Sequence, residues 1–122
     1  MQVSEIQFEG QPPIESYGGG GFRISGMFRA GGLIITPTRI DDWAASEVLS
    51  PADFAAPIAE AAQIDVLLIG VGADIAPLPA DVRHALDEAD LGYDAMATGA
   101  ACRTYNVLLA EDRRVAAALI AV

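Results

Sequence analysis

The sequence contains no lysine, because all seven basic residues among its 122 are arginine. A phosphate-binding loop of the Walker type, a Schiff base and a catalytic lysine are therefore excluded. The single histidine, His84, and the single cysteine, Cys102, cannot assemble a zinc, haem or iron–sulfur site of the usual ligand sets. One cysteine also cannot form an intrachain disulfide. We therefore expect a metal-free protein without a cofactor.

Long apolar runs and excess positive charge are also missing. No run approaches the roughly 18 residues that a membrane-spanning helix needs, so we expect no integral membrane association. The chain is acidic, with a formal net charge of -10 that repels nucleic-acid phosphates and anionic lipids, so we expect no nucleic-acid partner. It begins Met-Gln-Val-Ser-Glu without a basic segment and an apolar stretch behind it, and Cys102 is its one thiol. These features favour a reducing, cytoplasmic location.

The chain has the size and composition of one globular domain, residues 1–122. Hydrophobic residues make up 52% of it and charged residues 20%. A chain of this length buries roughly two thirds of the surface that its unfolded form exposes. We therefore expect it to fold on its own.

The first half has β patterns. Residues 3–8 alternate weakly, and β-rich runs at residues 22–25 and 33–36 are separated by glycines, which predicts a hairpin or meander. The glycine run at residues 18–21 fits no dinucleotide-binding template and predicts a mobile loop or a close backbone approach. Trp43 fits either an exposed anchor or a lid over the core.

The second half alternates strands with helices. Ser50 and Pro51 begin a helix by a capping residue and a first-turn proline, and Pro57 kinks or delays that helix. Pro79 opens a second helix, which we expect to end at Gly92. Such alternation implies right-handed crossovers and a largely parallel sheet. The expected strands are residues 64–69, 93–97 and 114–122, and the last helix covers residues 98–111.

Together these patterns predict a three-layer α/β fold, in which helices cover a mixed central sheet and an antiparallel β layer is added by the N-terminal half.

The run Thr98-Gly99-Ala100-Ala101-Cys102-Arg103-Thr104-Tyr105-Asn106-Val107-Leu108-Leu109, with Leu67-Leu68-Ile69-Gly70-Val71-Gly72 upstream, is the most distinctive part of the sequence. It resembles a small family of unknown biochemical activity. Eukaryotic members include an assembly factor for mitochondrial respiratory complex I and an adipogenesis-associated protein with a Mth-type domain. The resemblance covers nearly the whole chain and implies a β layer packed beside an α/β unit. It supplies no catalytic residue.

A ligand site is conceivable where the glycines follow the buried strand. Gly70-Val71-Gly72 stands where a phosphate-binding loop would lie, but Ile75 replaces the third glycine of the dinucleotide fingerprint, which favours a tight turn. If the strands that end at Gly70 and Ala97 are parallel, Gly72 and Thr98 are neighbours. Backbone N–H groups from Gly99 onward and the Thr98 hydroxyl could then hold a small anion, although Thr98 as an ordinary N-cap is the commoner case.

The helix at residues 98–111 has two faces. At 100° per residue its apolar side chains, Cys102 among them, face the sheet, so we expect a buried thiol. Arg103 and Val107 project from another face, which either the protein's own β layer or a partner covers. We expect Arg103 to point away from the crevice. Asn106 lies at the edge of the apolar face, where a structural hydrogen bond outweighs substrate binding.

No nucleophile and base can be paired from the sequence. His84 is the only imidazole, and it lies opposite the apolar face of its helix among acidic residues, as a solvated histidine does. Our leading hypothesis is therefore a non-catalytic interaction or assembly module with a protein partner, similar to the complex I assembly factors. The alternative is a small-molecule or anion-binding protein, with or without catalysis, that uses the crevice of Gly70, Gly72, Thr98 and Gly99. The oligomeric state stays open.

Overall fold

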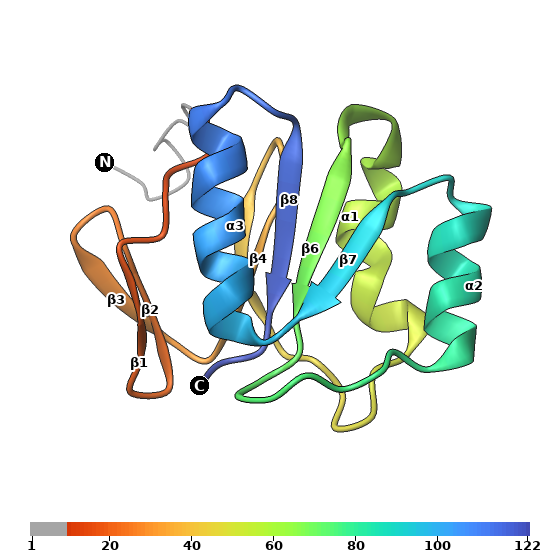
Figure 1. Cartoon of the computed structure of the whole chain (residues 1–122), viewed down its shortest axis with the longest axis horizontal. Coiled ribbons are helices and arrows are strands. Elements are labelled where there is room, and N and C mark those ends of the chain that lie inside the picture. Colours follow the sequence, from red (N-terminus) through yellow and green to blue (C-terminus); the bar gives the residue numbers. More distant parts are fainter. Residues whose placement is uncertain (1–9) are drawn as a thin grey trace, which may run out of the picture.

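A five-stranded mixed sheet lies at the centre of the protein, of which the computed structural model describes residues 10–122. Its strands follow the order β5-β4-β8-β6-β7. β8 runs parallel to β6 and β6 parallel to β7, whereas β4 is antiparallel to β5 and β8. The predicted mixed sheet is therefore confirmed (Figure 1). The strands are β4 (Gly32–Ile35), β5 (Ile40–Trp43), β6 (Val66–Gly70), β7 (Tyr93–Met96) and β8 (Val115–Leu119).

A separate antiparallel sheet of three strands, β1 (Ser16–Gly18), β2 (Gly21–Ile24) and β3 (Met27–Ala30), forms the expected N-terminal β layer. The two β-rich runs of the first half became β2 and β4, which are not partners in one hairpin. Strand β2 pairs with β1 and β3 in the N-terminal sheet, whereas β4 pairs with β5 and β8 in the central sheet. The glycine run is a tight turn between β1 and β2, and the Gly20 N–H donates to the Val122 carbonyl at 2.8 Å. The strand expected at residues 3–8 lies outside the described residues.

The helices are η2 (Pro51–Phe54), α1 (Ala55–Ala59), η3 (Ala61–Gln63), α2 (Ala80–Glu88) and α3 (Thr98–Ala110). As predicted, Ser50 caps the first of them, and its N–H donates to the Asp53 carboxylate at 2.8 Å. Pro57 accounts for the break into η2 and α1, because it has no N–H to donate. The expectation that Gly92 ends α2 was wrong. Asp90 takes the left-handed conformation there, with a φ of 56°.

Side chains alternate between the two faces of the central sheet, as period-2 strands require. Ile34, Leu67 and Ile69 pack with α2 and η2, whereas Leu33 and Leu68 pack with α3 and the N-terminal sheet. Figure 1 shows α3 and the N-terminal sheet on one side of the central sheet and α1 and α2 on the other. These three layers match the predicted fold class.

Trp43 is a lid over the core rather than an exposed anchor. Its side chain is buried at the end of β5, and its ring meets the Phe54 ring edge-on at a centroid distance of 5.5 Å. The indole N–H donates to the Asp53 carbonyl oxygen at 2.8 Å, so the polar atom is satisfied. The two open interpretations of Trp43 are thereby resolved in favour of the structural one.

Candidate functional site

The crevice expected from the sequence lies where β6 and β7 end. The Thr98 N–H donates to the Gly72 carbonyl at 2.8 Å, and the Gly72 N–H donates to the Thr98 hydroxyl at 3.0 Å. The same hydroxyl donates to the Ile120 carbonyl at 2.7 Å. Gly72 and Thr98 are therefore neighbours, as the parallel strands predicted.

Thr98 serves the fold at this point. It is fully buried and is the first residue of α3, while Ala97 takes the N-cap position. The expectation of Thr98 as N-cap was therefore wrong. Its hydroxyl joins the backbone after β6 to the backbone after β8, which leaves that oxygen committed within the chain.

Two of the glycines permit close approaches. A Cβ on Gly70 would lie 2.9 Å from the Thr98 Cα and 3.0 Å from a methyl carbon of Leu119. A Cβ on Gly99 would lie 2.6 Å from the Tyr17 phenol oxygen. These glycines let α3 pack against β6 and let β1 reach the first turn of α3, a structural reason for both.

Arg103 borders the crevice, contrary to the expectation that it points away. Its Nη1 donates to the Tyr17 phenol oxygen at 2.7 Å, so β1 lies against this face of α3. A hollow of about 360 Å³ is lined by both side chains together with Gly72, Gly99 and the C-terminal Val122. Helical periodicity distinguishes only the side of α3 that faces the central sheet, whereas the N-terminal sheet adds a second wall along the Arg103 side. Val107, one turn further, stays 56% exposed.

Two further polar side chains of α3, Asn106 and Tyr105, hold the segment that leads into β1. Asn106 accepts from the Ile14 N–H and donates to the Ile14 carbonyl, both at 2.8 Å. The Tyr105 phenol donates to the Pro12 carbonyl at 2.9 Å, and burial raises the pKa of Tyr105 well above its usual range. The structural role predicted for Asn106 is what the geometry shows.

Cys102 is 2% exposed, as its position on the helical wheel predicted. Burial raises the pKa of its thiol to about 11, against a smaller lowering by Arg103. Such a thiol is protonated at neutral pH and is a poor nucleophile. His84 lies on α2, on the opposite side of the central sheet, where it is exposed and 3.8 Å from the Glu88 carboxylate. Within residues 10–122 no cluster of His, Cys, Asp and Glu is arranged to hold a metal.

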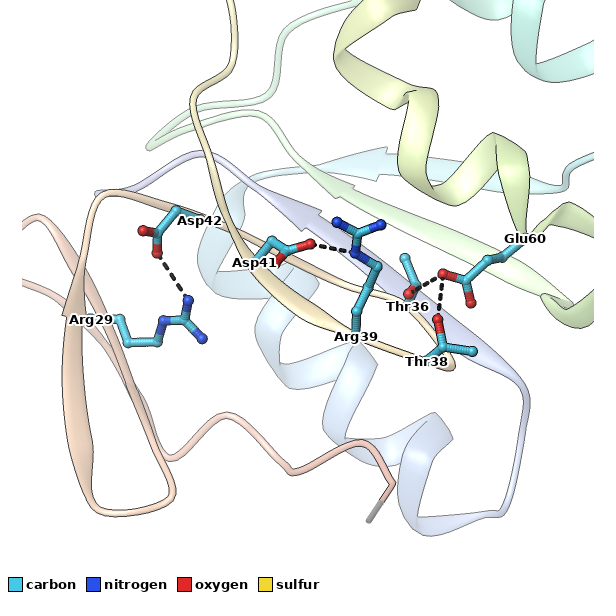
Figure 2. Close-up of polar contacts among 7 residues, drawn as sticks. All are labelled: Arg29, Thr36, Thr38, Arg39, Asp41, Asp42 and Glu60. Atoms are coloured by element: carbon cyan, nitrogen blue, oxygen red, sulfur yellow. Dashed lines mark hydrogen bonds and ion pairs between the residues drawn. The ribbon is translucent and has the colours of Figure 1, made fainter. Parts of the chain in front are cut away.

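A polar cluster that the sequence did not predict joins the β4–β5 turn to α1 (Figure 2). The Glu60 carboxylate accepts from the Thr36 hydroxyl at 2.6 Å and from the Thr38 hydroxyl at 2.9 Å through one oxygen. Its other oxygen is buried without a hydrogen-bond partner among the described residues. Since 24 residues separate Thr36 from Glu60, no local spacing could reveal this contact.

The exposed edge of β5 carries two ion pairs, which Figure 2 shows side by side. Arg39 binds the Asp41 carboxylate, and Arg29 of β3 binds the Asp42 carboxylate at 3.0 Å. Both pairs stand on the surface, where such pairs contribute little stability. At this edge of the sheet, each of these two arginines is therefore paired with an aspartate of β5.

The chain is 43% identical over 120 residues to an uncharacterised protein of Rhodobacter capsulatus, covering 98% of this chain and 93% of that one. It is 34% identical over 112 residues to NADH dehydrogenase [ubiquinone] 1 alpha subcomplex assembly factor 3 of Danio rerio, covering 88% of this chain. The match spans 63% of the zebrafish protein's length.

Among solved structures, the fold is similar to an outer membrane protein from Bartonella henselae, with a TM-score of 0.86 and 46% identity over 93% of this chain and 97% of that one. Between residues 10 and 122, no helix has the length and apolar character to span a membrane.

The family model for proteins of unknown function named DUF498/DUF598 matches residues 14–120, which include every residue of the crevice named above except Val122. The resemblance drawn from residues 98–109 is thereby confirmed. The chain belongs to the DUF498/DUF598 family of proteins of unknown function.

Proposed function

We propose that this protein is a non-catalytic interaction or assembly module that works by binding another protein in a reducing, cytoplasmic compartment. The observation that carries the proposal is the use of the α3 side chains. Thr98, Arg103, Tyr105 and Asn106 each have a hydrogen-bond partner elsewhere in the chain. These polar groups of α3 are engaged in contacts that hold other parts of the chain in place.

The lack of a usable nucleophile supports the same proposal. Cys102 is buried with a raised pKa, and the only imidazole lies across the central sheet. Nucleophilic catalysis needs a base within hydrogen-bond reach of the nucleophile. Among the described residues, Cys102 has no imidazole base on its side of the central sheet.

The zebrafish relative supports an assembly role, because its name describes an assembly factor for NADH dehydrogenase. This chain corresponds to part of that protein, so we carry over the binding of a protein partner and not the identity of the partner.

The test is affinity capture of the tagged protein from the cells that produce it, together with thermal unfolding against a panel of metabolites. We expect one protein partner in a stoichiometric amount and no metabolite that raises the unfolding temperature. Recovery of the chain alone, with strong stabilisation by one small molecule, would contradict the proposal, because a ligand of the folded state must stabilise it.

A second candidate function is the binding of a small molecule or anion in the crevice of Gly70, Gly72, Thr98 and Gly99. The hollow of about 360 Å³ favours it, since Gly72, Gly99 and Arg103 line that hollow beside the first turn of α3, whereas Gly70 and Thr98 do not. Titration with phosphate, sulfate and short dicarboxylates tests it. This candidate requires the amide signals of Gly72 and Gly99 to move at saturable concentrations, and unmoved signals reject it.

A further inference from the structure

The two edges of the central sheet differ in charge and shape. At one edge, β5 carries the ion pairs of Arg39 with Asp41 and of Arg29 with Asp42. Charged side chains of this kind keep an edge strand from pairing with another chain. At the other edge, β7 pairs with β6 and with no other strand among residues 10–122. The β7 edge carries no ion pair of its own within that part of the chain.

Backbone groups of β7 point outward at alternate residues. The Leu67 N–H donates to the Gly92 carbonyl and the Val71 N–H donates to the Met96 carbonyl, at 2.8 and 2.9 Å. In a parallel ladder the residues that bond to the neighbour alternate with those that do not. The N–H and C=O groups of Tyr93 and Ala95 therefore face away from β6, in the positions from which a further strand is bound.

An apolar groove lies beside these two residues. Its volume is about 320 Å³, and its walls are Tyr93 and Ala95 of β7, Ile75, Pro77 and Leu78 of the preceding loop, and Arg83 of α2. Ile75 is 77% exposed, so the loop presents a large apolar side chain at the rim of the groove. The groove lies on the sheet face that α2 covers, because Tyr93 and Ala95 pack against the core on that side.

The other face of β7 and its N-terminal end are acidic. Met96 packs toward α3, so Asp94, two residues earlier, stands exposed on that same face. At the start of β7, Asp87, Asp90 and Gly92 line a hollow of about 190 Å³. An incoming strand would therefore meet apolar walls and Arg83 on one face, the Asp94 carboxylate on the other face, and Asp87 and Asp90 at one end.

We propose that the β7 edge binds an extended segment of a partner protein in which apolar residues alternate with Lys or Arg. The segment adds as a strand beside β7, bonded to the backbone of Tyr93 and Ala95. Its apolar side chains enter the groove, and its basic side chains lie beside Asp94. A second copy of this chain is a poor occupant, since two chains of net charge -10 repel each other. The inference rests on the proposed function and names the surface through which it works.

The experiment uses a blocked synthetic peptide of alternating lysine and valine, titrated into isotope-labelled protein. We expect saturable shifts centred on the amides of Tyr93 and Ala95. A peptide with glutamate in place of lysine should not bind, and neither should the lysine peptide with all its backbone amides methylated, which cannot donate to β7. Equal binding of the three peptides, or shifts spread over the acidic surface without a centre at β7, would overturn the proposal.

Three variants distinguish binding at the β7 edge from nonspecific attraction between the basic peptide and the acidic protein. Ala95→Pro removes an outward N–H without touching the bonds to β6, and it should abolish peptide binding. Asp94→Lys should exchange the preference, so that the glutamate peptide binds and the lysine peptide does not. Glu111→Lys, an equal charge change at the far end of α3, is the matched control and should bind like the parent. Unchanged binding by Ala95→Pro or Asp94→Lys contradicts the proposal.

Ile75→Asp tests the groove even if the strand variants misfold. The Ile75 side chain is exposed in a loop, so we expect its replacement to leave the sheet intact. It should weaken binding of the lysine peptide at least tenfold. Capture from cells distinguishes failure of the β7 site from failure of the proposed function. A partner that Ala95→Pro and Ile75→Asp still bind rejects the β7 site and leaves the proposed function standing, whereas the absence of any partner rejects the proposed function itself.

Discussion

Helix α3 and strand β7 are both next to the crevice, but they differ in whether their polar groups have hydrogen-bond partners within the described part of the chain. On α3, the hydroxyl of Thr98 and the amide of Asn106 are satisfied by backbone from other parts of the chain. On β7, the outward backbone groups of Tyr93 and Ala95 have no strand beside them among the described residues. The most recognisable sequence pattern therefore maintains the fold, and the β7 edge that we propose as the binding surface carries no motif.

Asn106→Ala is the strongest way to break the α3 side of the comparison. It orphans both the N–H and the carbonyl of Ile14, so we expect a loss of about 3 kcal/mol in the free energy of unfolding. Urea unfolding measures it. Val107→Ala, on the exposed neighbour, is the control and should change stability by less than about 0.5 kcal/mol. A stable Asn106→Ala protein that loses its partner would make Asn106 a binding residue instead.

Gly70→Ala tests the close packing of β6 against α3. The added methyl would lie 2.9 Å from the Thr98 Cα, so backbone must shift, at a cost of about 2 kcal/mol. Thermal unfolding gives the value. Gly19→Ala has open space around the new methyl group but a φ of 65°, and it measures the backbone strain alone. A Gly70→Ala variant as stable as the parent would show that α3 does not pack as closely as described.

The buried thiol gives a pH dependence. The pKa of Cys102 is about 11 in the folded protein, above the ordinary 9.0, so the unfolded chain loses this proton first as pH rises. Stability contributed by the thiol is present below about pH 9 and should fall by about 1 kcal/mol between about pH 9 and pH 10. Cys102→Ala should lack this part of the decline. Parallel curves for the two proteins would show that the thiol is not buried.

The surface change Ile75→Asp should have the smallest effect on stability, less than about 0.5 kcal/mol, because its side chain is exposed. Its effect should appear in partner binding alone. A large drop in the free energy of unfolding would mean that Ile75 belongs to the core and would remove it from the proposed groove.

Regular patterns explain what could be predicted from the sequence. Strands β6 and β8 were predicted because each is a continuous apolar run that is buried along nearly its whole length. Helix α3 was predicted because its buried residues recur on one face. β3 and β5 were not predicted, since each is four residues long and contains charged residues, Arg29 in β3 and Asp41 and Asp42 in β5. Short edge strands with charges resemble loops in sequence.

The site was predictable only where neighbouring strands determined it. Parallel strands placed Gly72 beside Thr98, as expected. The contact of Arg103 with Tyr17 joins residues 86 apart, and that between Thr36 and Glu60 joins two layers, so helical periodicity could not foresee either. Such contacts depend on how the N-terminal sheet and α1 pack in the fold.

The central claim is that the β7 edge, and not the crevice, binds a partner. One set of titrations tests it most directly, because the amide signals of both places are observed in the same labelled protein. The lysine–valine peptide is added first, and phosphate and a short dicarboxylate are added in separate runs. The account predicts saturable amide shifts at Tyr93 and Ala95 with the peptide, and none at Gly72 and Gly99 with the anions. Shifts at Gly72 and Gly99 with a silent β7 would contradict it and would make the crevice the functional site.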